Sequence, residues 1–397
     1  MTRTGADWRL LDGVVTAWFD APSLVEGAAL AERVLLVSGE AAVDVRATGV
    51  RVRLDRVDHA EAVSAAARHL ALSPDPTLLQ ELTVVLEAAD PAALAPFWQR
   101  ASGYVPGTAG SLVDPVRRDP TLRIQPSSDH RPLRHRIHLD VVRPPAQVEQ
   151  ADLGEAYGPY GVCHADPDGN EVDLVPGWTL GDEAETADWQ VVFGAMACYH
   201  TTSIQQQGAL AAAAAEIARS AGFPLLIDLR AGLVVLDSGK DQWEDGAHDP
   251  GLDVVALARE LQGAARSLGA VADPGLPRFV QVFFDAADVP GLRSFWMAAL
   301  GYSPDPRPGL TDIVDPRRLA PELLFQELDA SDTARRRQRN RFRLELAVPG
   351  DVAPSRVEAI VAAGGSLLDR SGDRWHLTDP EGNELAVVGG ARPRVRS

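Results

Sequence analysis

Short stretches of the chain alternate between apolar and polar residues, a pattern that places one face of a β-strand in a core. In the first 75 residues this alternation covers residues 14–19 and 43–54, the latter as two adjacent strands. An Ala-, Leu- and Val-rich segment over residues 21–38 and a second apolar segment over residues 60–72 have the length of helices instead. The first block of sequence therefore predicts the order strand, helix, strand, strand, helix.

A second block follows and ends near residue 178. It predicts a strand over residues 82–87 and then a helix beginning at Asp90-Pro91, because Asp favours the N-cap and Pro the first helical position. Further strands are predicted in the segments 122–125, 136–142 and 171–175. Before the last of them, Asp166-Pro-Asp-Gly-Asn170 has the composition of a tight turn.

The same succession recurs in the second half of the chain. Three pairs of segments align in the same order: Val113–Gln125 with Val314–Gln326, Phe97-Trp98 with Phe295-Trp296, and Asp166–Glu171 with Asp379–Glu384. Matches in this number and order indicate that a two-block unit has been duplicated. We therefore predict an internally duplicated α+β protein whose copies cover residues 8–178 and 189–390.

Composition excludes several classes of function. The formal net charge of -18 would repel nucleic-acid phosphates, and no apolar run is long enough to span a membrane. Cys163 and Cys198 are too few for a disulfide framework or a thiolate metal site. We expect a cytoplasmic protein, because the first residues contain no apolar signal segment. The arginine-rich residues 335–343 predict a solvated turn, with binding of a small anion as the alternative.

In the second block, a strand is followed by Asp90-Pro91, Phe97-Trp98, Gly103-Tyr104, Leu122–Gln125, Arg136–Asp140 and Asp166–Glu171, and the second copy repeats most of these motifs. With them the block resembles the glyoxalase-like branch of the vicinal oxygen chelate superfamily. The resemblance implies paired βαβββ modules that curl into a half-open barrel around a pocket. In active members of that superfamily, the pocket holds a divalent metal that chelates substrate oxygens.

The first block contains Trp8–Gly13, Val43–Arg46 and Val50–Leu54 around its first helix. In this order it resembles a pterin-4a-carbinolamine dehydratase. The histidines that the resemblance implies for an active enzyme are missing at Ser38–Ala41 and at Ala221–Pro224. Without an imidazole for acid–base chemistry near neutral pH, we expect no dehydratase activity. The expected domains are dehydratase-like over residues 8–75 and 189–272, and glyoxalase-like over residues 78–178 and 277–390.

The glyoxalase resemblance also implies metal ligands on the first and last strands of each βαβββ module. These positions hold Thr83, Gln125, His138 and Asp173 in the first copy, and Gln281, Gln326, Arg343 and Ala386 in the second. Divalent cations prefer imidazole, carboxylate and amide ligands. The first copy therefore offers His138, Asp173 and Gln125 for a divalent metal, whereas the second offers no comparable set. The alternative for His138 is a hydrogen-bonded interior histidine, and the sequence requires no cofactor.

Three functions are compatible with these features. We favour a small-molecule-binding protein with degenerate metal sites, whose pocket is formed with Trp98, Trp296, Gln281, Gln326 and Arg343. One alternative is a lyase or isomerase that uses a metal in the first glyoxalase-like pocket, and the other is a non-catalytic structural or interaction protein. No catalytic residue can be assigned. Because fused copies can pack about a pseudo-twofold axis, we predict a monomer whose partner is a small molecule.

Overall fold

The computed structural model of the chain describes residues 5–242, 252–305, 307 and 309–390. These residues form two compact units. The first unit takes the described residues up to 79 and from 177 to 278, and the second takes residues 80–176 and 279–390. Each unit therefore combines one block from each copy: the two first blocks pack together, and so do the two second blocks.

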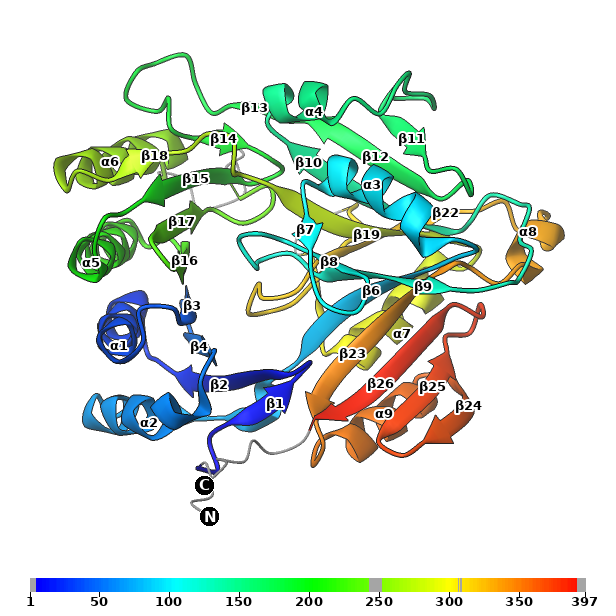
Figure 1. The fold of residues 1–397 in the computed structure, drawn as a ribbon, viewed down its shortest axis with the longest axis horizontal. Helices are drawn as coiled ribbons and strands as arrows, with labels where there is room; N and C mark the ends of the chain where they lie inside the picture. Colours follow the sequence, from blue (N-terminus) through cyan, green and yellow to red (C-terminus); the bar gives the residue numbers. More distant parts are fainter. Residues whose placement is uncertain (1–4, 243–251, 306, 308, 391–397) are drawn as a thin grey trace. The chain divides into compact units, whose positions relative to one another are not determined.

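The first unit is an antiparallel sheet whose helices lie on one side of it (Figure 1). Among the described residues, eleven strands follow the order β1-β2-β4-β3-β16-β17-β15-β14-β13, with β5 beside β2 and β18 beside β15. The first copy contributes β1 (Arg9–Leu11), β2 (Val14–Asp20), β3 (Ala42–Arg46), β4 (Gly49–Leu54) and β5 (Ser73–Pro74). The remaining strands are β13 (Trp178–Thr179), β14 (Gln190–Val191), β15 (Ala195–His200), β16 (Leu226–Arg230), β17 (Leu233–Asp237) and β18 (Val271–Ala272).

The helices of the first unit are α1 (Leu24–Val37), α2 (Ala60–His69), α5 (Ile204–Ala221) and α6 (Val254–Ser267), with 3-10 turns η1 (Val57–His59) and η2 (Pro76–Leu78). Helices α1 and α5 have serine N-caps, Ser23 and Ser203. The hydroxyl of each serine accepts a hydrogen bond from a backbone N–H of the first turn. The buried faces of the two helices are rich in Ala and Leu and form one core with the alternating valines of β3 and β4.

The two copies meet in the middle of this sheet, where β3 pairs antiparallel with β16. Asp44 lies opposite Asp228 in the register. Arg46 donates to Asp228 at 2.6 Å, and Arg230 donates to Asp44 at 2.6 Å, so each copy supplies the cation for the other copy's carboxylate. We call Asp44, Arg46, Asp228 and Arg230 the seam quartet.

The second unit contains two sheets (Figure 1). Counted over its described residues, the seven-stranded sheet has the order β11-β12-β10-β19-β22-β21-β20, and the eight-stranded sheet has the order β24-β25-β26-β23-β6-β9-β8-β7. The first copy supplies β6 (Glu81–Ala88), β7 (Val105–Pro106), β8 (Ser111–Val113), β9 (Thr121–Pro126), β10 (Ile137–Arg143), β11 (Cys163–Ala165) and β12 (Glu171–Pro176). The second supplies β19 (Phe279–Ala286), β20 (Ser303–Pro304), β21 (Ile313–Val314), β22 (Leu323–Glu327), β23 (Phe342–Pro349), β24 (Ser366–Ser371), β25 (Arg374–Thr378) and β26 (Glu384–Gly390).

Each of these two sheets is built from half of one copy and half of the other. β10 pairs antiparallel with β19, and β6 pairs antiparallel with β23. The four ligand positions expected together in the first copy are therefore split between the sheets. Thr83 and Gln125 lie on β6 and β9 of the eight-stranded sheet, whereas His138 and Asp173 lie on β10 and β12 of the seven-stranded sheet. Alternation predicts which face a residue occupies, but it does not say which copy's strand lies beside it.

The second unit's helices are α3 (Pro91–Ser102), α4 (Pro145–Ala151), α7 (Val289–Leu300), α8 (Thr333–Arg337) and α9 (Ala353–Ala362). Both α3 and α7 begin with an Asp N-cap, Asp90 and Asp288, and have Pro in the first two helical positions, as the sequence predicts for the first of them. They end at Gly103 and Gly301, whose φ values of 70° and 68° favour glycine over other residues.

Trp98 and Trp296 lie inside the second unit, and each residue is 0% exposed. The indole of Trp98 donates to Asp166 at 2.9 Å, and that of Trp296 donates to Asp379 at 3.1 Å. The expectation that these two tryptophans rim a binding pocket is therefore wrong. They belong to the core, where each ties a helix to the repeated Asp-Pro-x-Gly-Asn turn.

The mixed α+β class, with several sheets, is confirmed. Within the described residues, no helix is both long and apolar enough to cross a membrane.

Candidate functional site

Two polar residues of β10 share the face of the seven-stranded sheet that is turned away from its core. Ile137, Leu139 and Val141 of this strand belong to the hydrophobic core. Because side chains alternate along a strand, His138 and Asp140 lie on the opposite face. Both are nonetheless buried, with 5% and 7% of their surfaces exposed.

Neighbouring strands bring further polar groups to the same face. The register places Asp173 of β12 beside Asp140 on one side and Gln281 of β19 beside it on the other. Phe283 of β19 lies beside His138. One row of the sheet thus holds two carboxylates and an amide, with an imidazole in the next row.

These side chains converge closely. One ligand atom from each of His138, Asp140 and Asp173 can be chosen so that all three lie within 4.8 Å of one another. The amide of Gln281 donates to Asp140 Oδ2 at 2.6 Å, which orients the carboxylate. The imidazole of His138 stacks on Phe283 with ring centroids 4.3 Å apart, and its Nε2 lies 3.4 Å from Asp140 Oδ1.

Several buried polar atoms of this cluster lack a hydrogen-bond partner. Within the described part of the chain they are His138 Nδ1, Asp140 Oδ1 and Gln281 Oε1. When the imidazole is neutral and carries its proton on Nε2, which lies 3.4 Å from Asp140 Oδ1, His138 Nδ1 and Gln281 Oε1 still present lone pairs without a donor. Buried acceptors without partners are rare because each costs free energy, so their grouping calls for a further positive partner.

The local charges favour a cation. Burial alone would lower the pKa of His138, but the carboxylates of Asp140, Asp173 and Asp285 outweigh it and raise this pKa above its ordinary value. The pKa of Asp173 is raised by burial and by the charge of Asp140, although His138 opposes the shift. Several carboxylates around one imidazole leave an excess of negative charge.

A divalent cation fits this donor set. His138, Asp140 and Asp173 would supply one imidazole and two carboxylates, and the Gln281 amide oxygen lies on the same row. Such a mixture suits Mn²⁺, Fe²⁺ or Zn²⁺. Cys163 lies opposite Asp173 in the register, and without a metal burial raises the pKa of its thiol to about 12.

The corresponding positions of the eight-stranded sheet are occupied by ion pairs. Arg343 and Glu345 of β23 stand where β10 has His138 and Asp140. Glu345 accepts from Arg123 at 3.0 Å and from Arg374 at 2.5 Å. These ion pairs outweigh the effect of burial and lower the pKa of Glu345. Its carboxylate is neutralised by the chain itself, and the surrounding guanidinium groups would repel a metal ion.

The structure brings together only some of the predicted site residues. His138 and Asp173 lie together, and Gln281 joins them. Gln125 does not, because it lies in the eight-stranded sheet, where it accepts from Arg343 at 2.6 Å. Gln326 is exposed and donates to Asp285 at 3.3 Å. Asp140 was missed, although its spacing of two residues from His138 on one predicted strand was a usable signal.

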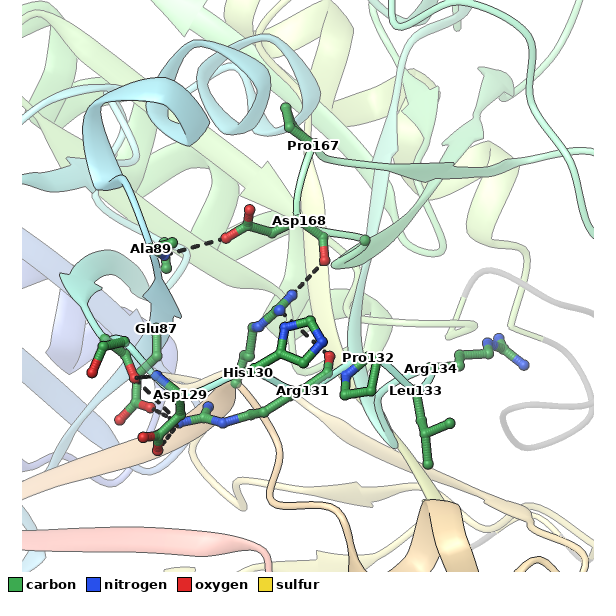
Figure 2. Close-up of a pocket in the computed structure, with 15 residues that line it drawn as sticks. Glu87, Ala89, Asp129, His130, Arg131, Pro132, Leu133, Arg134, Pro167 and Asp168 are labelled. Atoms are coloured by element: carbon green, nitrogen blue, oxygen red, sulfur yellow. Dashed lines mark hydrogen bonds and ion pairs between the residues drawn. The ribbon is translucent and has the colours of Figure 1, made fainter.

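A cavity of about 380 Å³ lies elsewhere in the second unit (Figure 2). Its walls are the loop of residues 127–134, the turn of residues 167–169, the end of β6 and the side chain of Arg341. His138, Asp140 and Asp173 do not line it.

His135 makes the stability of the second unit depend on pH. It is 5% exposed, and burial together with Arg341, Arg131, Arg335 and Arg136 lowers its pKa to about 4. The unfolded chain takes up a proton near the ordinary value of 6.5, whereas the folded chain does so only near 4. Stability from this residue is therefore complete above pH 6.5 and is lost as the pH falls toward 4, by about 3 kcal/mol.

The matched variant is His135→Asn, because Asn340 occupies the equivalent place in the second copy. Urea unfolding of both proteins at several pH values measures the effect. We expect the wild type to lose about 3 kcal/mol relative to His135→Asn between pH 7 and pH 4. If the free energies of unfolding of the two proteins changed equally with pH over this range, the prediction would be contradicted.

Comparison with known proteins gives one family. The family model of the glyoxalase-like domain matches residues 83–175 and 281–388, which make up just over half of the chain. No curated protein matches the sequence.

Among solved structures, a mutant of glyoxalase I from Zea mays is 10% identical and has a TM-score of 0.40, covering 79% of this chain and 95% of that one. The cppA protein from Streptococcus pneumoniae is 10% identical with a TM-score of 0.34, over 78% of this chain and 97% of that one. A glyoxalase/bleomycin resistance protein/dioxygenase family enzyme from Burkholderia phytofirmans is 16% identical with a TM-score of 0.23, over 27% of this chain and 94% of that one.

Proposed function

The chain belongs to the family of proteins with glyoxalase-like domains, and from that premise we propose that it binds a small oxygen-bearing molecule through a divalent cation held by His138, Asp140 and Asp173. The observation that supports this most directly is the group of buried acceptor atoms without partners at the convergence of β10 and β19. A bound cation would satisfy these atoms and balance the carboxylates.

The cation would act as a Lewis acid toward oxygen atoms of the bound molecule. The chain's own contribution is positioning. Phe283 fixes the plane of the His138 imidazole, and Gln281 fixes the carboxylate of Asp140. Such supporting contacts set ligand orientation and tune affinity. We propose no cation site in the eight-stranded sheet, because Arg343 and Glu345 occupy the positions equivalent to His138 and Asp140.

A lyase or isomerase is the second candidate, and Glu171 favours it. This residue lies two positions before Asp173 on the same face of β12. Its carboxylate accepts hydrogen bonds from Tyr157 at 3.0 Å and from Arg134 at 2.7 Å, which fix its orientation. In this candidate function Glu171 would transfer the proton. Turnover of a small oxygenated substrate that is lost in Glu171→Gln, with metal binding retained, would support this candidate over simple binding.

For the first unit we propose an inactive dehydratase-like scaffold. The order strand, helix, strand, strand, helix occurs in both of its copies. His200 is exposed and pairs with Asp273 at 3.1 Å, with no second imidazole in its hydrogen-bond contacts. We also propose that the protein is a monomer, because the joined β3 and β16 already unite the two copies within one chain.

Direct metal titration tests the main proposal. Protein stripped with a chelator should bind about one Mn²⁺ or Zn²⁺ per chain in calorimetry and elemental analysis. His138→Ala and Asp140→Asn should each weaken binding about 100-fold, which corresponds to roughly 3 kcal/mol, because each removes a ligand. The matched control is Gln125→Ala, which changes a predicted ligand that the structure places in the other sheet and should leave affinity unchanged.

Two results would count against the proposal. One is a wild-type protein that binds neither ion. The other is binding that survives both substitutions, which would place the ion elsewhere.

A further inference from the structure

The cavity shown in Figure 2 lies at one of two equivalent corners of the second unit. Alignment of the copies pairs Arg341 with Arg136 and Asp168 with Glu381. At both corners the arginine donates to the backbone carbonyl of the aligned acidic residue: Arg341 to Asp168, and Arg136 to Glu381 at 3.2 Å. The two corners therefore share a backbone arrangement and can be compared residue by residue.

At the corner formed by the turn of the second copy, a carboxylate of the chain faces the arginine. Glu381 accepts from the backbone N–H groups of Ala287 and Asp288 at 3.1 and 2.8 Å. The same carboxylate lies 3.8 Å from the guanidinium of Arg136, which is only 1% exposed. The glutamate side chain thus fills this corner and compensates the buried charge.

At the other corner the acidic side chain is one methylene shorter. Asp168 reaches the backbone N–H of Ala89 at 3.3 Å, and Figure 2 shows its carboxylate directed there. Arg341 contacts only neutral oxygen atoms in its hydrogen bonds: those of Asp168, of Asn170 at 3.5 Å and of Arg131 at 3.4 Å. No carboxylate among the described residues lies within 4.0 Å of its guanidinium nitrogens. The cavity occupies this corner instead.

The carboxylates of Glu87, Asp129 and Asp168 also line the cavity, but none of them forms an ion pair with Arg341. Arg131, which also lines the cavity, pairs with Glu87 at 2.5 Å and with Asp129 at 2.9 Å. Glu87 is further shared with Arg339 and Arg343. The low pKa of nearby His135 is consistent with a positive local potential, since after burial the charges of Arg341 and Arg131 are its main causes.

We propose that this cavity binds the carboxylate group of a small molecule, placed beside Arg341 as the Glu381 carboxylate is placed beside Arg136. The equivalent corner shows which group this arrangement can hold. There a carboxylate lies beside the guanidinium group and accepts hydrogen bonds from backbone N–H groups. A volume of about 380 Å³ suits a small organic acid. This site is independent of the cation site, because the cavity is lined by none of its ligands.

The inference can be tested on the full chain with succinate as the probe. Calorimetric titrations at constant ionic strength, on protein stripped of metal with a chelator that is then removed by dialysis, exclude any contribution from metal. Wild-type protein is expected to bind succinate, and Arg341→Gln should weaken binding at least 10-fold by removing the anchor. Asp168→Glu should weaken it to a similar extent, because the longer side chain would place the chain's own carboxylate in the corner. Glu at the aligned position 381 shows that the fold accepts this residue.

The matched control is Arg336→Gln, which removes one positive charge from an exposed position and should leave succinate affinity within about twofold of wild type. Inorganic phosphate serves as the second probe. Absence of succinate binding to the wild type, or affinity retained in both Arg341→Gln and Asp168→Glu, would overturn the proposal. Tighter binding of phosphate than of succinate would overturn the assignment to carboxylates. If Arg341→Gln fails to fold, Asp168→Glu alone decides.

Discussion

Replacing Asp44 with Asn is expected to lower the free energy of unfolding of the first unit by about 3–5 kcal/mol. Asp44 is 0% exposed and lies at the centre of the sheet, opposite Asp228. Burial would raise its pKa, but Arg230, Arg51, Arg53 and Arg46 hold that pKa well below the ordinary value. The amide would keep the shape of the side chain and remove the charge. Several buried guanidinium groups would then lose their shared anion, which is the costly way to break a buried ion pair.

Urea unfolding monitored by circular dichroism measures the change, and hydrogen exchange in peptides from β3 and β16 assigns it to the first unit. The matched control is Asp58→Asn, which breaks the exposed pair with Arg56 and should leave the free energy of unfolding nearly unchanged, because solvent screens that pair. Because the pKa of Asp44 is lowered in the folded state, its contribution is present above about pH 4 and is lost below it. The difference in the free energy of unfolding between the wild type and Asp44→Asn should therefore become smaller only in strong acid. A variant as stable as the wild type at pH 7 would contradict this role of the seam quartet.

Much of the local structure follows from the order of residues. The predicted helix over residues 21–38 is found as Leu24–Val37, and the alternating segment 43–54 forms β3 and β4. These elements depend on interactions between residues close in sequence, such as the caps and the period-two pattern. Asp44 is also recognisable as the polar position of an apolar strand. The position of Asp44 opposite Asp228 is not predictable in this way, because β3 and β16 are brought together by the packing of two copies.

The candidate site shows the same division. His138 and Asp173 were both predicted from the sequence, and the parallel pairing of β10 with β12 within one block brings them together. Gln125 was grouped with them because it belongs to the same copy, but its strand pairs with β6 in the other sheet. Gln281 arrives from the other copy through β19. Which half of a duplicated chain completes a sheet depends on tertiary packing, since the two copies present similar edges.

Only part of the role of the repeated turn could be predicted from the sequence. The sequence predicts a turn at Asp166–Asn170, and the structure gives Gly169 a φ of 83° there. Trp98, far from this turn in the sequence, was expected to line a binding pocket. In the structure Trp98 is a donor to the turn, because a buried indole N–H needs an acceptor and Asp166 supplies it.

Substituting Asp166 with Ala is therefore expected to destabilise the second unit by about 4 kcal/mol or more. The carboxylate accepts from Trp98 at 2.9 Å, from the Asn170 side chain at 2.8 Å, and from the backbone N–H groups of Asp168 and Asn170 at 2.9 Å each. Asp166 and Asn170 are 4% and 0% exposed, so water does not readily replace the lost acceptor. Each buried donor left without a partner costs about 1–3 kcal/mol.

Chemical denaturation followed by tryptophan fluorescence measures this loss, with Trp98→Phe as the matched control. That variant removes one donor and keeps an aromatic ring in the core, so we expect it to cost about 1–2 kcal/mol. Asp379→Ala should repeat the large effect at the second turn, where Trp296 and Asn383 donate to the carboxylate. If Asp166→Ala were no more destabilising than Trp98→Phe, the indole contact alone would account for the turn's stability. The carboxylate would then not be the acceptor around which the turn is built.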